Sequence, residues 1–193
     1  MTYDPSKHHR RSIRLKGYDY TTPGAYFVTI VTHHRECLFG EIENGEMRLS
    51  RAGEIAARCW EAISAHFASV GLDLFVVMPN HLHGIIIMGA GRGEASANTM
   101  PEMPTRLTAD ASPLRRDGTQ PGSLPAIIQN FKSVSTRCLN ALCATPGVHV
   151  WQRDYYEHIV RDEAGLTRLR GYIQNNPSGW ALDELHPVAL PSG

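Results

Sequence analysis

The stretch VVMPNHLHGIIIMG, residues 76–89, places two histidines, His81 and His83, inside a run of apolar residues. Pro79 and Asn80 break the chain there, so the stretch predicts the end of one strand and a second strand that returns beside it. Because alternate side chains of a strand share a face, the two imidazoles are expected on one side, about 7 Å apart at ~3.3 Å per residue. Aliphatic residues occupy both faces of the returning strand, so both faces of its sheet are predicted to be covered.

On both sides of this hairpin, strand-like and helix-like patterns alternate along the chain. Strands are indicated by β-branched and aromatic runs, and helix starts by capping residues. The expected elements are a strand (25–33), a hairpin turning at Asn44-Gly45, a helix over 51–67 capped by Ser50, strands at 72–79 and 81–89, a helix after Ser123, a strand in the second half of 151–161, and a helix after Asp162 that ends near Pro177. In the helix after Ser50, the spacing of Ile55, Cys59 and Ile63 predicts one buried face.

Without the early hairpin, this order is β-α-β-β-α-β, which is the ferredoxin-like or RRM-like arrangement. We therefore predict an α+β fold, with an antiparallel sheet and helices on one of its faces. One helix, at the C-terminal end, is left over to cover the other face, and it carries Tyr172. Residues 1–193 are interpreted as a single domain on this basis.

Residues 90–122 differ in composition from the rest of the chain. The segment from Gly89 to Gly122 contains five glycines, four prolines and no aromatic residue. Such a segment cannot form a core of its own, so it predicts a long mobile loop within the domain.

The formal net charge is zero, which argues against a protein that coats nucleic acid through its whole surface. The basic residues are nevertheless clustered, because residues 7–16 hold five Lys or Arg and no acidic residue. Arginine suits bidentate contacts to phosphate, although a solvated basic tail explains this segment equally well. The candidate phosphate contacts in this segment are Arg10, Arg11, Arg14 and Lys16.

Nothing in the sequence indicates export or a membrane. There is no apolar run of 18 residues, the N-terminal residues lack an apolar signal region, and the four cysteines form no CxxC pair. A cytoplasmic, nucleoid-associated location is therefore expected.

The chemistry that the histidine pair could perform depends on the last helix, because an HxH pattern by itself is a weak signal. Tyr172 borders the apolar stripe of that helix, and Asn176 lies one turn further on the same side. Two imidazoles and one carboxamide would suit a divalent ion that holds a phosphate, and a tyrosine beside that ion could attack the phosphorus. From spacing alone, an ordinary half-buried helix tyrosine remains the better explanation of Tyr172.

Five blocks of sequence, in order, resemble the REP-associated tyrosine transposases, single-tyrosine enzymes of the HUH endonuclease superfamily. These blocks are YFVTIVT, VVMPNHLHGII, IIQNFKS, WQRDYYEHIVR and YIQNNP, and the inserted loop at 90–122 is the departure from the family pattern. The family's His-hydrophobic-His motif falls on His81 and His83, its nucleophilic tyrosine on Tyr172 and its third metal ligand on Asn176.

The resemblance implies cleavage of single-stranded DNA beside a hairpin, with Mg²⁺ or Mn²⁺ at the three ligands and a 5′-phosphotyrosine intermediate on Tyr172. A monomer or a homodimer is expected, with no membrane partner. Further candidates for DNA contacts are Lys132 and Arg153 for phosphates, and Tyr155 and Tyr156 for stacking on bases. Two alternatives remain, a catalytically idle nucleic-acid-binding module of ferredoxin-like fold and an HUH replication-initiator nuclease.

Overall fold

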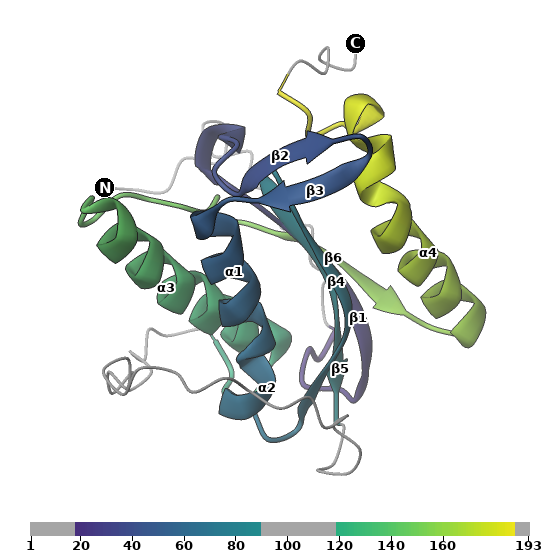
Figure 1. Ribbon diagram of the computed structural model, residues 1–193. Helices are drawn as coiled ribbons and strands as arrows, with labels where there is room; N and C mark the ends of the chain where they lie inside the picture. Colours follow the sequence, from purple (N-terminus) through teal and green to yellow (C-terminus); the bar gives the residue numbers. More distant parts are fainter. Residues whose placement is uncertain (1–17, 90–118, 188–193) are drawn as a thin grey trace, which may run out of the picture.

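The computed structural model describes residues 18–89 and 119–187, and its centre is a four-stranded antiparallel sheet (Figure 1). The strand order is β4-β5-β1-β6, which is the order of a ferredoxin-like sheet. The strands are β1 (Gly24–Val31), β4 (Val70–Met78), β5 (His81–Met88) and β6 (Tyr156–Val160). The predicted α+β fold is thus confirmed, and the histidine-bearing strand β5 lies in the interior of the sheet between β4 and β1.

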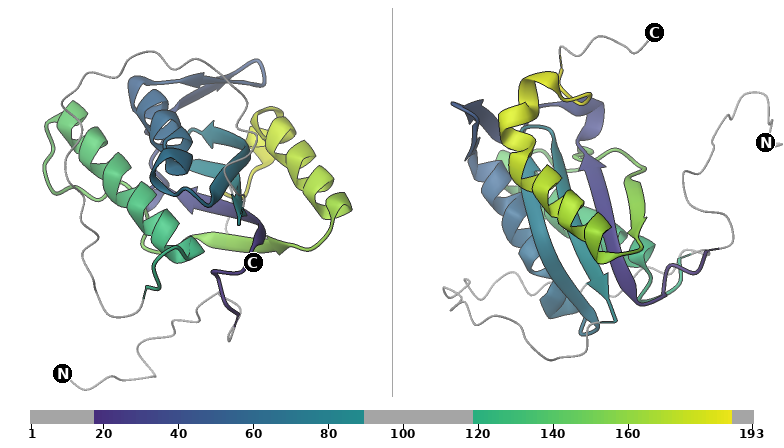
Figure 2. Two further views of the ribbon diagram at one scale, coloured as in Figure 1. Left: turned by 90° about the horizontal axis from the view of Figure 1, so that it is seen from below. Right: turned by 90° about the vertical axis from the view of Figure 1, so that its right-hand side faces the viewer.

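Helices cover both faces of this sheet, as Figure 2 shows. On one face lie α1 (Arg51–Glu61), the short α2 (Ile63–His66) and α3 (Leu124–Cys143), and on the other lies α4 (Glu163–Gly179). The remaining elements are the hairpin β2 (Gly40–Glu43) and β3 (Glu46–Leu49), and the short 3₁₀ helices η1 (His33–Arg35) and η2 (Trp180–Leu182).

Two of the three predicted helix caps form as expected. The backbone amide of Gly53 donates to Ser50 Oγ at 3.2 Å, and that of Gly165 donates to Asp162 Oδ1 at 2.6 Å. Ser123 occupies the N-cap position of α3, but its hydroxyl donates to the carbonyl of Gln120 instead of accepting from the helix.

The buried residues form two separate cores, one on each face of the sheet. The larger core packs α1 and α3 against the strand residues that include Tyr26, Leu82 and Ile86. The smaller core, on the α4 side, is built on Phe27, Ile85 and Ile173. The predicted alternation along β5 is therefore confirmed, since Leu82 and Ile86 face one core and Ile85 faces the other.

Two sequence predictions need correction. The buried face of α1 is centred on Ala56 and Trp60, whereas Ile55 and Cys59 are only partly buried. The helix predicted over 51–67 is divided into α1 and α2. The predicted end of the last helix near Pro177 is confirmed to within two residues, since α4 ends at Gly179.

The basic segment at 7–16 and nearly all of the loop at 90–122 lie outside the described residues. Within the described part, no helix is both long enough and apolar enough to cross a membrane.

Candidate active site

His81 and His83 point from β5 toward the α4 side of the sheet, and both are buried, with 0% and 3% exposure. Their Nε2 atoms are 3.0 Å apart. Each ring is held through its other nitrogen, because His81 Nδ1 is 2.9 Å from Asn80 Oδ1 and His83 Nδ1 is 2.8 Å from Thr29 Oγ1. The two Nε2 atoms are therefore directed at one common position.

Burial keeps both imidazoles neutral. It lowers the pKa of His81 to about 4, although the nearby carboxylate of Asp183 acts in the opposite direction. Burial is the main reason that the pKa of His83 lies well below its ordinary value, and the electrostatic effect of His81 lowers it further. Neutral imidazoles are the form that ligates metals, so no proton has to leave these rings at neutral pH.

A third group, Asp183, was not predicted from the sequence. It follows η2 in an irregular segment, and its Oδ2 lies 4.0 Å from His81 Nε2. One ligand atom from each of His81, His83 and Asp183 falls within 4.8 Å of the others, so these three side chains could hold a metal ion. No periodic pattern in the sequence predicts a role for this aspartate, because it lies beyond the end of the helical pattern of α4.

Asn176 adds an oxygen atom to the same region. The residue is 6% exposed and lines the same groove as His83 and Asp183. Its Oδ1 is buried and accepts no hydrogen bond from the described residues. A buried carbonyl oxygen without a donor is costly, and a cation would satisfy it. Two imidazoles, a carboxylate and a carboxamide thus form a donor set that fits a divalent ion.

Tyr172 lies one helical turn before Asn176 and is 48% exposed. Its hydroxyl oxygen is 3.3 Å from His83 Nε2, and its ring packs edge-on against Phe27 and His83. Burial of the hydroxyl raises the pKa of Tyr172 first, and the charge of Asp183 raises it further, while Asn176 opposes both. The phenol is therefore protonated at neutral pH and has to lose its proton in any reaction as a nucleophile.

The chain is 43% identical over 185 residues to an uncharacterized protein of Haemophilus influenzae, and the match covers 95% of this chain and 97% of that protein. The two belong to one family. No protein-family model matches the chain.

Among solved structures, a REP-associated tyrosine transposase bound to a REP hairpin matches with a TM-score of 0.53 and 13% identity, covering 94% of this chain and 93% of that chain. The fold is that of a REP-associated tyrosine transposase. A candidate transposase from Deinococcus radiodurans is more distantly similar, with a TM-score of 0.40 and 16% identity over 85% of this chain and 97% of that chain.

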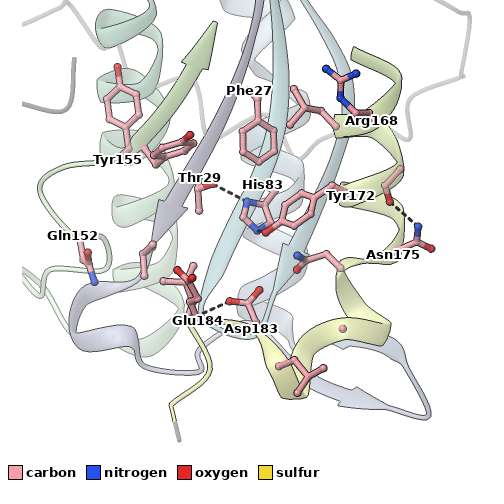
Figure 3. A pocket seen from close by; sticks show the side chains of 18 of the residues that line it. Phe27, Thr29, His83, Gln152, Tyr155, Arg168, Tyr172, Asn175, Asp183 and Glu184 are labelled. Atoms are coloured by element: carbon pink, nitrogen blue, oxygen red, sulfur yellow. Dashed lines mark hydrogen bonds between the residues drawn. The ribbon is translucent and has the colours of Figure 1, made fainter. Parts of the chain in front are cut away.

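In this transposase fold, an open groove of about 1090 Å³ runs between α4 and the β1–β6 side of the sheet (Figure 3). His83, Tyr172 and Asp183 lie together in the groove, and Arg168 projects from α4 one turn before Tyr172. Tyr156, which is 50% exposed on β6, also lines the groove and contacts Phe27 edge-on.

Tyr155 also lines the groove, and it packs against the larger core, with Lys132 Nζ over its ring at 5.4 Å. Lys132 Nζ also donates to the backbone carbonyls of residues 152, 153 and 154, at 2.9, 3.3 and 2.9 Å. The structure therefore gives Lys132 a part in holding this segment, and its phosphate contact stays a prediction. Arg153 is exposed on the same segment, while Arg10, Arg11, Arg14 and Lys16 lie outside the described residues.

Proposed function

We propose that this protein is a metal-dependent tyrosine transposase, which cuts single-stranded DNA and rejoins it. The observation that carries the proposal is the position of the Tyr172 hydroxyl, 3.3 Å from Nε2 of a buried, neutral histidine that shares a possible metal site with His81 and Asp183. Metal-dependent phosphoryl transfer needs a nucleophile close to groups that can hold a metal ion, and Tyr172 lies beside two neutral imidazoles and a carboxylate. The transposase fold supports the same conclusion.

The ligands of the ion are proposed to be His81, His83 and Asn176, with Asp183 as an additional carboxylate. A bound Mg²⁺ or Mn²⁺ would neutralise the charge that develops on the scissile phosphate. Imidazole ligands favour Mn²⁺ over Mg²⁺, and the two oxygen ligands suit both. The chain's part is to present these four groups on β5, near the end of α4 and just after η2, and three of them, His83, Asn176 and Asp183, line the groove.

Tyr172 supplies the nucleophile. Its phenolic oxygen forms a bond to phosphorus, the bond from phosphorus to the 3′ oxygen breaks, and the leaving oxygen takes a proton from water. The phenolic proton passes to solvent, which reaches Tyr172 through its exposed side. The products are a 5′-phosphotyrosine and a free 3′-OH, and attack by a 3′-OH on the phosphotyrosine rejoins DNA without another source of energy.

The substrate is proposed to be an unpaired strand beside a DNA hairpin. The related structure holds a REP hairpin, and the groove here presents an exposed aromatic ring, Tyr156, and a cation, Arg168. Exposed bases stack on aromatic side chains, and arginine binds phosphate through paired donors. Fully paired DNA of the same sequence would offer no free base to Tyr156.

A covalent-adduct assay tests the proposal. The protein, Mn²⁺ and a single-stranded hairpin oligonucleotide should give an adduct that survives denaturant, and peptide mapping should place it on Tyr172. Tyr172→Phe should lose the adduct while it still binds Mn²⁺ and DNA. Tyr156→Phe is the matched control, because it removes the same hydroxyl from the same groove and should keep the adduct. An adduct that persists in Tyr172→Phe, or no adduct in the parent protein, would contradict the proposal.

A further inference from the structure

Asn80 joins three segments of the chain at the turn between β4 and β5, and its side chain is fully buried. Its Nδ2 donates to the carbonyl of Arg35 at 3.1 Å and to the carbonyl of Leu185 at 2.7 Å. Its Oδ1 lies 2.9 Å from His81 Nδ1. All of the polar atoms of this carboxamide are thus engaged at the edge of the metal site.

These contacts determine which way the carboxamide faces. Backbone carbonyls only accept hydrogen bonds, so the atom that contacts both of them has to be the NH₂ group. The remaining atom is then the oxygen, which only accepts, and His81 Nδ1 has to be the donor. Neutral His81 therefore carries its proton on Nδ1 and leaves Nε2 with a free lone pair, directed at His83 and Asp183.

His83 is under no such constraint. Its Nδ1 partner is the hydroxyl of Thr29, which can donate or accept. Without a cation, Nε2–H of His83 can donate to the lone pair of His81 across their 3.0 Å separation, which avoids two facing lone pairs. To ligate a cation through Nε2, His83 would carry its proton on Nδ1, and that N–H would donate a hydrogen bond to the hydroxyl of Thr29. One imidazole is therefore preset for ligation and the other adapts.

The same amide group also holds the segment that carries Asp183. We define residues 183–186 as the C-terminal strap. Leu185 donates its backbone amide to Asp183 Oδ1 at 2.7 Å, which leaves Oδ2 as the atom nearest His81. The strap is fastened to the body of the protein by Asn80 through Leu185 and by the guanidinium of Arg35, which donates to the carbonyl of Glu184 at 3.1 Å.

From these contacts we propose that Asn80 is a positioning residue for the metal site. It fixes His81 as the Nδ1–H tautomer and, through the strap, sets the position of Asp183, so that two ligands from distant parts of the chain are aligned by one carboxamide. The inference rests on the proposed metal site for its purpose, but its first consequence, the tautomer of His81, is a property of the metal-free protein.

The first measurement uses the unaltered protein without metal. Nitrogen-15 NMR of the imidazoles at pH 7 should show His81 with its proton on Nδ1 and a bare Nε2. A signal for His81 that places the proton on Nε2 would overturn the proposal without any variant being made.

The second measurement compares Asn80→Ala with Asn140→Ala. Asn140 also donates its Nδ2 to a backbone carbonyl, that of Val148 at 3.0 Å, but it lies on α3 away from the site. Asn80→Ala should show a mixture of His81 tautomers, and its Mn²⁺ affinity by calorimetry should fall roughly 10- to 100-fold, the usual effect of removing a partner of a metal ligand. Asn140→Ala should change neither. If a folded Asn80→Ala kept His81 as the Nδ1–H tautomer and bound Mn²⁺ as tightly as the parent protein, the role of Asn80 would be refuted. Absence of Mn²⁺ binding in the parent protein would instead refute the metal site and leave the tautomer result standing.

Discussion

The hydroxyl oxygen of Tyr172 lies 3.3 Å from Nε2 of His83, although the two residues are 89 positions apart in the chain. The contact depends on the smaller core, in which Ile173, the neighbour of Tyr172, packs against Phe27 and Ile85. Ile85 is two residues after His83 on the same strand face, so the packing that places α4 on the sheet also places the tyrosine beside the histidine.

Substitution of the proposed metal ligands should show which of them contribute most to the reaction. His81→Ala and His83→Ala should each reduce adduct formation in Mn²⁺ by roughly 100-fold or more, while Asn176→Ala should cost roughly tenfold, because a water can replace one oxygen ligand on a hard cation. His66→Ala, which alters an exposed histidine on α2, is the control. The metal site would be wrongly assigned if both histidine variants reacted as fast as the parent protein.

Stability should depend on pH through His81. Its pKa is about 4 in the folded protein against 6.5 as the ordinary value, so between these pH values the unfolded chain binds more protons. The free energy of unfolding should therefore fall as pH drops from about 6.5 to 4, by at most ~1.4 kcal/mol per pH unit for this one proton. Urea denaturation at a series of pH values gives the free energy of unfolding at each pH. This free energy should change less with pH in His81→Gln than in the parent protein, and an equal dependence on pH would contradict the prediction.

Two glycine substitutions should change stability in opposite directions. A Cβ at Gly84 would overlap the indole of Trp60, whereas one at Gly171 would meet nothing within 4 Å. Gly84→Ala should lower the free energy of unfolding by roughly 1–3 kcal/mol through overpacking. Gly171→Ala, inside α4, should raise it by roughly 0.4–1 kcal/mol. Thermal or urea denaturation measures both, and a neutral Gly84→Ala would show that Trp60 moves aside freely.

The ion pair between Arg170 and Asp73 should affect the proposed nucleophile, Tyr172, more than the proposed metal ligands. Arg170 donates to Asp73 Oδ2 through Nε at 3.0 Å and through Nη2 at 2.7 Å, which ties α4 to β4 two residues before Tyr172. The pair is partly exposed, so its loss should cost about 1 kcal/mol or less of stability. Arg170→Ala should slow adduct formation while leaving Mn²⁺ affinity nearly unchanged.

A double-mutant cycle with Asp73→Ala checks that the effect belongs to the pair. The two single substitutions and the double substitution should slow adduct formation to a similar extent, because each breaks the same contact. Additive effects would mean that Arg170 and Asp73 act separately.

Much of the fold could be predicted because local patterns and tertiary packing agree. The apolar alternation of β5 continues on both faces, and Ser50 and Asp162 cap helices in the structure as expected. The buried face of α1 was predicted wrongly, because the four-residue spacing of apolar side chains favoured the face with Ile55 and Cys59. The structure instead buries Gly53 and Ala56, which allow close approach, together with Trp60.

The candidate site was only partly visible in the sequence. Periodicity predicts that His81 and His83 share a face and that Tyr172 and Asn176 share another, and the structure brings the two faces together. Asp183 could not be predicted, because its position depends on hydrogen bonds from Asn80 and Arg35 to an irregular segment. Likewise, the three carbonyls that surround Lys132 Nζ are backbone atoms, which no sequence pattern reports.

The packing of Trp60 over Gly84 has a consequence for protein design. Gly84 directly follows His83 in the chain but faces the opposite side of β5, where its missing side chain makes room for the indole. Grafting only His-Leu-His onto a strand of another scaffold would therefore leave out the feature that seats this strand against its helix layer. The transferable unit is the four-residue stretch His-Leu-His-Gly together with an indole on the facing helix. In a graft with alanine after the second histidine, the added methyl group should overlap the indole and strain the sheet that has to hold the two histidines.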